Sequence, residues 1–189
     1  METKKSEPIV RPADLRQWFV MRDLKRHNAR FPAYRLLGDM NIEVFTPMVH
    51  KQVMRQGKRI PREVPFMQDL LFVHDSRRVL DPIVERIGTL QYRFLRDGYR
   101  TPMTVEDAEM ERFIRAVESS LSPRFYTPQE ITPEMVGKQV RIIGGPFNNY
   151  EGRLQKLQGS RVKRLFVELS NLLVVSVEVQ TEYIQLLER

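Results

Sequence analysis

The 189-residue sequence contains no cysteine. A chain without thiols cannot form disulfides, use a thiolate nucleophile or hold zinc through cysteine. It also lacks any apolar run near the roughly 20 residues that a membrane helix needs. The segment from Met1 to Pro8 has no apolar core of a secretory signal. We therefore expect a cytoplasmic protein with no membrane partner.

The patterns of common catalytic sites are missing as well. The three histidines, His27, His50 and His74, lie in different predicted elements, and none has a His or Glu partner at metal-ligand spacing. No glycine-rich loop ends in Lys-Ser or Lys-Thr before a helix, and no nucleophile elbow is present. We predict that the protein is not an enzyme, with no catalytic residue, no metal and no cofactor.

Positive charge, by contrast, is abundant and confined to one part of the chain. The formal net charge is +7, and residues 1–60 hold 13 Lys and Arg against 6 Asp and Glu, whereas residues 61–189 hold 18 of each. A basic surface concentrated in one region is typical of contact with nucleic acid phosphates. A solvated basic face is the alternative.

Hydrophobic periodicity predicts alternating short strands and helices in the first part of the chain. Strands are predicted at 18–21, 42–45, 49–60 with a return at 62–64, 70–73 and 89–95, and helices at 25–37, 76–87 and, after a Thr104 cap, to Glu118. This order predicts helices on one face of a mostly antiparallel sheet. The turn near Gly57 is rich in cations, which protect strand edges from aggregation. These cations are Lys51, Arg55, Lys58, Arg59 and Arg62.

The character of the sequence changes at residues 119–133, where three prolines interrupt any apolar period. This segment is predicted to be a linker. Strands then follow at 139–143, 153–157, 165–169, 172–177 and 184–187, which is the spacing of a small β-barrel. We therefore predict an α+β chain: a flexible tail at 1–15, a domain at 16–118, the linker at 119–133 and a barrel domain at 134–189.

The barrel region carries the most specific motif in the chain. Between Val136 and Leu154 a strand leads into Gly144-Gly145-Pro146-Phe147, and Glu151-Gly152 opens a second strand. This segment resembles the KOW motif, which occurs in NusG-type factors and in some ribosomal proteins. The first part of the chain resembles the NGN domain of the NusG family. The segments that carry this second resemblance are Trp18-Phe19-Val20, a basic helix, Gly38 to Pro47, a basic hairpin, Val64-Pro65-Phe66 and Leu70-Leu71-Phe72-Val73.

The resemblance implies an NGN-type α/β sandwich followed by an SH3-like KOW barrel. It implies a monomeric bacterial transcription elongation and antitermination factor that binds the clamp helices of the RNA polymerase largest subunit. Gln68-Asp69-Leu70 stands where the family usually has Pro-Gly-Tyr or a similar trio. With the extended stretch from Arg96 to Pro102, this departure makes the chain most similar to the UpxY group, antiterminators of polysaccharide operons.

The resemblance also implies residue roles in the NGN half. The positions that match the polymerase-binding cavity are Trp18, Phe45, Phe66, Met67 and Leu70. Burial in the core is the alternative for all five, most of all for Trp18 and Phe45. The positions that match the contact with the displaced non-template DNA strand are Arg22, Lys25, Arg26, His27, Arg30 and Arg35. For His27 the alternative is a solvated helix residue.

In the KOW half, the resemblance implies a contact with termination factor Rho, a ribosomal protein or another regulator. The loop expected to make it consists of Phe147, Asn148, Asn149 and Tyr150, with a packed barrel-end aromatic as the alternative for Phe147. A second basic turn is predicted at Arg161, Lys163 and Arg164, either touching RNA or solvated. The competing function is a ribosome- or RNA-binding KOW protein with a structural role, although ribosomal KOW proteins lack an NGN half.

Overall fold

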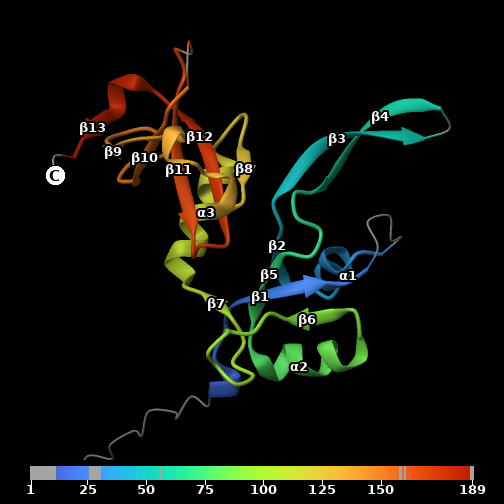
Figure 1. Cartoon of the computed structure of the whole chain (residues 1–189). Helices are drawn as coiled ribbons and strands as arrows, with labels where there is room; N and C mark the ends of the chain where they lie inside the picture. Colours follow the sequence, from blue (N-terminus) through green and yellow to red (C-terminus); the bar gives the residue numbers. More distant parts are fainter. Residues whose placement is uncertain (1–11, 26–30, 56, 158, 160, 188–189) are drawn as a thin grey trace, which may run out of the picture. The chain divides into compact units, whose positions relative to one another are not determined.

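The computed structural model describes residues 12–25, 31–55, 57–157, 159 and 161–187 (Figure 1). The chain forms two compact units, and the division does not follow sequence order. The N-terminal unit comprises residues Met1–Met48 and Met67–Thr104, and the C-terminal unit comprises Val49–Phe66 and Val105–Arg189. Helices are few and the paired strands are antiparallel, so the predicted α+β class is confirmed.

The N-terminal unit is built on a sheet with the order β2-β5-β1-β6. These strands are β2 (Glu43–Phe45), β5 (Leu71–Asp75), β1 (Gln17–Asp23) and β6 (Leu90–Tyr92). Helices α1 (Ala33–Asp39) and α2 (Arg77–Arg86) cover one face, where Phe19 and Val73 pack with Leu37 and Leu80 in one buried cluster. Each such buried side chain contributes about 1.5–3 kcal/mol through the hydrophobic effect.

Several elements of this unit differ from the sequence-based prediction in their bounds or type. Helix α1 starts at Ala33 rather than near Lys25, because Pro32 occupies the N-cap position with extended backbone angles (φ −66°, ψ 154°); residues 26–30 of the predicted helix lie outside the described residues. Thr104 does not cap a helix but belongs to strand β7 (Thr104–Val105). Within the predicted tail, Pro12–Asp14 form a short 3-10 helix, and Asp14 lies 3.4 Å from Arg78 of α2.

The C-terminal unit contains a six-stranded sheet with the order β13-β9-β10-β11-β12-β8. Its strands are β9 (Val136–Ile142), β10 (Glu151–Gln155), β11 (Lys163–Leu169), β12 (Leu173–Val179), β13 (Ile184–Leu186) and β8 (Arg124–Tyr126). The first five match the strands predicted from the sequence and fit a KOW-like β domain. Strand β8, followed by 3-10 turns at Pro128–Glu130 and Pro133–Met135, lies inside the segment predicted to be a linker.

A buried arginine explains why the predicted linker belongs to the sheet. Arg164 is 1% exposed and donates to the Ser122 carbonyl (2.6 Å), the Ser176 hydroxyl (2.8 Å) and the Glu178 carboxylate (2.8 Å). Removal from water, and then the neighbouring Arg124 charge, lower the pKa of Arg164 below its ordinary value. Arg164 is therefore not part of a solvated or RNA-binding turn, as predicted, but an anchor that holds residue 122 beside β12.

Helix α3 (Asp107–Glu118) packs on β11 and β12 of the C-terminal unit. Its buried face consists of Met110, Phe113 and Ala116, each 0% exposed. The Glu109 carboxylate accepts hydrogen bonds from the Ser170 backbone nitrogen (2.5 Å) and hydroxyl (2.6 Å) in the β11–β12 turn. The structure thus divides the chain near residue 104, whereas the sequence placed a boundary after residue 118.

The remaining two strands, β3 (Met48–Arg55) and β4 (Lys58–Pro65), form a separate two-stranded sheet. Figure 1 shows them as a long ribbon. Gly57, in the turn between them, has a φ of +75°, a left-handed conformation that favours glycine. The predicted hairpin is therefore present, and both strands are longer at its base than the sequence indicated.

Candidate functional site

One face of the N-terminal sheet, opposite α1 and α2, carries three of the five predicted polymerase-binding residues. Trp18 pairs with His74 in the β1–β5 register, and Phe45 pairs with Phe72 in the β2–β5 register. Because side chains alternate along a strand, Trp18, Phe45, Phe72 and His74 share this face. Leu70, two residues before Phe72, continues the same row.

These residues differ in accessibility. Trp18 is 3% and Leu70 is 2% exposed, whereas Phe45 and Met67 are partly exposed. The Thr46 hydroxyl donates to the Leu70 carbonyl (3.1 Å), and the Leu70 backbone nitrogen donates to the Met67 carbonyl (3.4 Å). These two bonds bring Phe45, Met67 and Leu70 to one end of the sheet.

Trp18 and Phe66 have other neighbours. The Trp18 ring stacks on His74 with 5.0 Å between ring centroids, and His74 Nδ1 lies 2.9 Å from Glu43 Oε2. Phe66 belongs to the C-terminal unit, where its ring lies 5.7 Å from that of Phe125. The described contacts therefore group Phe45, Met67 and Leu70. Trp18 and Phe66, the other two predicted residues, contact different side chains.

The predicted DNA-binding residues lie on three different segments of the same unit. Arg22 is exposed on β1 and Arg35 is exposed on α1, where its guanidinium lies 5.7 Å from the Tyr34 ring. Lys25 follows β1, and its Nζ donates to the Phe31 carbonyl (2.8 Å). The other three predicted residues, Arg26, His27 and Arg30, lie outside the described residues.

Two polar residues that the sequence analysis did not single out hold the ends of this basic segment. Asp23 is 7% exposed, and its carboxylate accepts from the backbone nitrogens of Lys25 (3.0 Å) and Ala33 (2.6 Å). Gln68 Nε2 donates to the Lys25 carbonyl (2.6 Å). A carboxylate at the end of a buried strand, directly before a run of cations, was the one signal in the sequence that could have indicated Asp23.

The predicted partner loop of the C-terminal unit has structural roles for all four residues. Phe147 and Tyr150 are buried (6% and 4% exposed) and pack edge to face, 5.7 Å apart. The Tyr150 hydroxyl donates to the Arg112 carbonyl of α3 (2.8 Å), and the Asn148 side chain accepts from the Gly144 nitrogen (2.7 Å). Asn149 has a left-handed φ of 65°. The expectation of an exposed aromatic loop was wrong, because the two rings fill the unit's interior.

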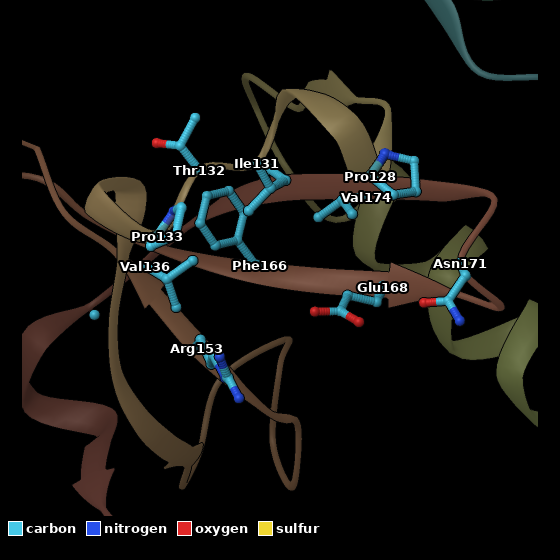
Figure 2. A pocket seen from close by; sticks show the side chains of 11 residues that line it. Pro128, Ile131, Thr132, Pro133, Val136, Arg153, Phe166, Glu168, Asn171 and Val174 are labelled. Carbon is cyan, nitrogen blue, oxygen red and sulfur yellow. The ribbon is translucent and has the colours of Figure 1, made fainter.

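Concave surfaces do lie on the C-terminal unit. One, of about 490 Å³, has Phe147 and the cations Arg161 and Lys163 among its lining residues. Another, of about 560 Å³, has the Phe166 ring among its lining residues, together with Arg153 and Glu168 (Figure 2). Prolines of the segment before β9 contribute to its wall. Concavities that combine apolar walls with a few polar groups are typical of binding sites.

Metal-binding and membrane-spanning features were sought across the described ranges. Within them, no three acidic or histidine side chains converge as metal ligands. None of the helices in that part of the chain has the length and apolar character needed to cross a bilayer.

Comparison with known proteins identifies the family. A family model described as "Transcription termination factor nusG" matches residues 16–114, more than half of the chain. No protein with a curated description matches. A solved structure, "Domain interaction in Thermotoga maritima NusG", is 15% identical, covers 93% of this chain and 99% of that chain, and gives a TM-score of 0.47. On the strength of the family match, the chain belongs to the NusG family of transcription factors.

Proposed function

We propose that the chain is an elongation and antitermination factor that binds the clamp helices of the RNA polymerase largest subunit. The observation that carries this proposal is the grouping of Phe45, Met67 and Leu70 at one end of the N-terminal sheet. Phe45 and Met67 are partly exposed there. An aromatic beside a flexible methionine suits the apolar tip of a helical hairpin. Members of the family act in transcription without catalysing a reaction.

The other two proposed contacts act differently in this proposal. Trp18 is buried against His74 and supports the sheet that presents the surface. Phe66 contributes through the part of its ring that Phe125 leaves accessible.

The test is binding of the full chain to purified RNA polymerase. The double variant Phe45→Ser/Met67→Lys removes the two accessible members. Loss of a hot-spot residue costs at least about 2 kcal/mol, or roughly 30-fold in Kd. The matched control, Leu95→Ser/Val79→Lys, changes two residues of the same unit that are 45% and 41% exposed. Trp18 fluorescence checks that both variants are folded. Equal affinities of the two variants would contradict the proposed surface.

We also propose that Arg22, Lys25 and Arg35, with Arg26, His27 and Arg30, contact the displaced non-template DNA strand. Support comes from the exposure of Arg22 and Arg35 and from the two side chains, Asp23 and Gln68, that fix the ends of the segment. Arginine pairs with phosphates and stacks on bases, which is what single-strand binding requires. The test crosslinks the protein to each base of the non-template strand in an elongation complex. The variant Arg22→Gln/Arg35→Gln should lose the crosslinks near the upstream edge of the transcription bubble.

For the C-terminal unit we propose recruitment of a second protein, either Rho or a ribosomal protein. With Phe147 and Tyr150 packed inside, support rests on the neighbouring concavity and its exposed cations, Arg161 and Lys163. We further propose that the chain, like UpxY factors, serves a specific polysaccharide-type operon. Affinity purification from a bacterial lysate distinguishes the proposed transcription factor from the competing function. Recovery of polymerase would favour the transcription factor, whereas recovery of ribosomes without polymerase would favour a structural KOW protein.

A further inference from the structure

The β3–β4 ribbon carries a run of exposed cations, and the functions proposed above do not use it. Lys51, Lys58, Arg59 and Arg62 are all exposed along it. Among the described residues, none of these four cations has a carboxylate partner. Glu63 is the single acid in residues 48–65, against five Lys and Arg.

Alternation along β4 places these charges around the ribbon rather than on one side. Lys58 and Arg62 are four residues apart and share a face, while Arg59 points to the opposite face. Cations that serve only to protect a strand from aggregation are needed along its unpaired edge and not on both faces of the ribbon. Cations on both faces are instead suited to an element that lies between two walls of phosphate, such as the sides of a groove in a nucleic acid duplex.

The composition of the ribbon between the cations indicates which kind of nucleic acid it suits. Residues 48–65 contain no Phe, Tyr or Trp, so the ribbon lacks the stacking platforms typical of single-strand binding. The major groove of B-DNA admits a two-stranded ribbon, whereas the major groove of A-form RNA is too deep and narrow for side chains to read. Apolar side chains are exposed beside the cations, with Met54 at 66% and Ile60 at 41% exposure, and such groups contact thymine methyls in that groove.

We propose that the β3–β4 ribbon is a binding arm for double-stranded DNA, held mainly by phosphate contacts of Lys51, Lys58, Arg59 and Arg62. Binding of this kind releases counterions, so affinity falls steeply with salt. None of these four cations is among the residues proposed above to bind polymerase or single-stranded DNA. The arm acts on duplex DNA with no polymerase present.

The test measures binding of the full chain to a labelled DNA duplex by fluorescence anisotropy at several salt concentrations. The variant Lys58→Gln/Arg59→Gln/Arg62→Gln removes three ribbon cations. The control Arg96→Gln/Arg112→Gln/Lys138→Gln removes three exposed cations elsewhere, so both carry the same net charge. Each lost phosphate contact lowers the slope of log K against log salt by about 0.9, so the ribbon variant should lose about 2.7 from the slope.

That change in slope corresponds to a measurable difference. Between about 50 and 200 mM salt, the affinity of the unmodified chain should fall about 40-fold more than that of the ribbon variant. The control should keep the original slope. The charge-preserving variant Lys58→Arg/Arg59→Lys/Arg62→Lys should bind duplex DNA like the unmodified chain, which separates loss of charge from loss of folding.

Three results would overturn the proposal. One is an equal loss of slope in the ribbon and control variants, which would mean that only net charge matters. Another is an equal or larger effect of the ribbon variant on duplex RNA or on single-stranded DNA. The third is unchanged DNA binding accompanied by concentration-dependent self-association, which would assign the cations to edge protection. The DNA measurement contains no polymerase. Its outcome therefore does not depend on the outcome of the polymerase-binding test with Phe45→Ser/Met67→Lys.

Discussion

Replacing Arg164 with alanine should destabilise the C-terminal unit while leaving the N-terminal unit folded. The arginine is 1% exposed, and its guanidinium joins β11 to β12 and to residue 122 of the segment before β8. Alanine would remove this donor from the buried Ser176 carbonyl and from the carbonyl of the exposed Ser122. The Ser176 hydroxyl would keep its bond to Gln155 (2.7 Å).

The size of the effect follows from these contacts. Removing one partner of a buried charged pair typically costs 3–5 kcal/mol, largely because the remaining groups lose their compensation. The Glu178 side chain is 44% exposed, so water can solvate its carboxylate after the change. We therefore take the lower end, about 3 kcal/mol. At a urea m-value of about 1.5 kcal/mol/M, the unfolding midpoint of this unit should fall by about 2 M.

The single tryptophan makes the assay specific to each unit. Trp18 is the only tryptophan of the sequence and lies in β1 of the N-terminal unit. Its fluorescence therefore reports that unit, while backbone amide signals of β11 and β12 report the other. In urea titrations of the full chain, Arg164→Ala should shift the β11 and β12 signals and leave the Trp18 transition in place.

Two comparisons decide whether the reasoning is right. Arg164→Lys keeps the charge but loses the fork of donors, so it should fall between alanine and the original residue. Lys163→Ala, an exposed neighbour, should change stability by less than about 0.5 kcal/mol. An Arg164→Ala midpoint within error of Lys163→Ala would refute the buried network. An equal shift of the Trp18 signal would refute its confinement to one unit.

Other predictions concern pH, glycine and the basic segment. Burial raises the pKa values of Tyr92 and Tyr150 above the ordinary 10.0. The stability that their protonated hydroxyls contribute is therefore fully present below pH 10.0 and lost as pH rises further, and Tyr92→Phe/Tyr150→Phe should flatten this alkaline decline in urea titrations. Gly152→Ala places a Cβ 2.5 Å from the Phe166 carbonyl oxygen and should lower the free energy of unfolding by about 3 kcal/mol. In Gly38→Ala the new Cβ meets nothing within 4 Å, so this change should be neutral or stabilising. Thermal unfolding of the two variants distinguishes these effects. Asp23→Asn should cost about 1–2 kcal/mol and increase amide exchange at Ala33; unchanged exchange would contradict its role.

The sequence predicted most strands, and the reason is visible in β11. Leu165, Phe166 and Val167 form a short continuous apolar run, and such a run is a local property of the chain. What joins Arg164 to Ser122 is not local: the partners are 42 residues apart. Charge in a sequence indicates solvent exposure on average, so a lone buried arginine cannot be recognised until its distant acceptors are known.

The candidate site was predictable to a similar extent. That Trp18, Phe45 and Leu70 share one face of the sheet follows from alternation once the strands are paired, but the pairing register comes from the fold. Phe66 shows the limit of position in sequence. It adjoins Met67, yet its ring lies against Phe125, and no local pattern links residues so distant in the chain.

The departure from the usual family trio explains how two proposed surfaces are connected. At these positions Gln68 donates to the Lys25 carbonyl (2.6 Å), and the Asp69 carboxylate accepts from Arg93 (3.0 Å). Leu70, next in sequence, joins the apolar end of the sheet through Thr46. Three consecutive residues thus link the base of the basic segment, the chain after β6 and the apolar end of the sheet. The apolar end of the sheet and the basic segment proposed to bind single-stranded DNA therefore adjoin one another within the N-terminal unit.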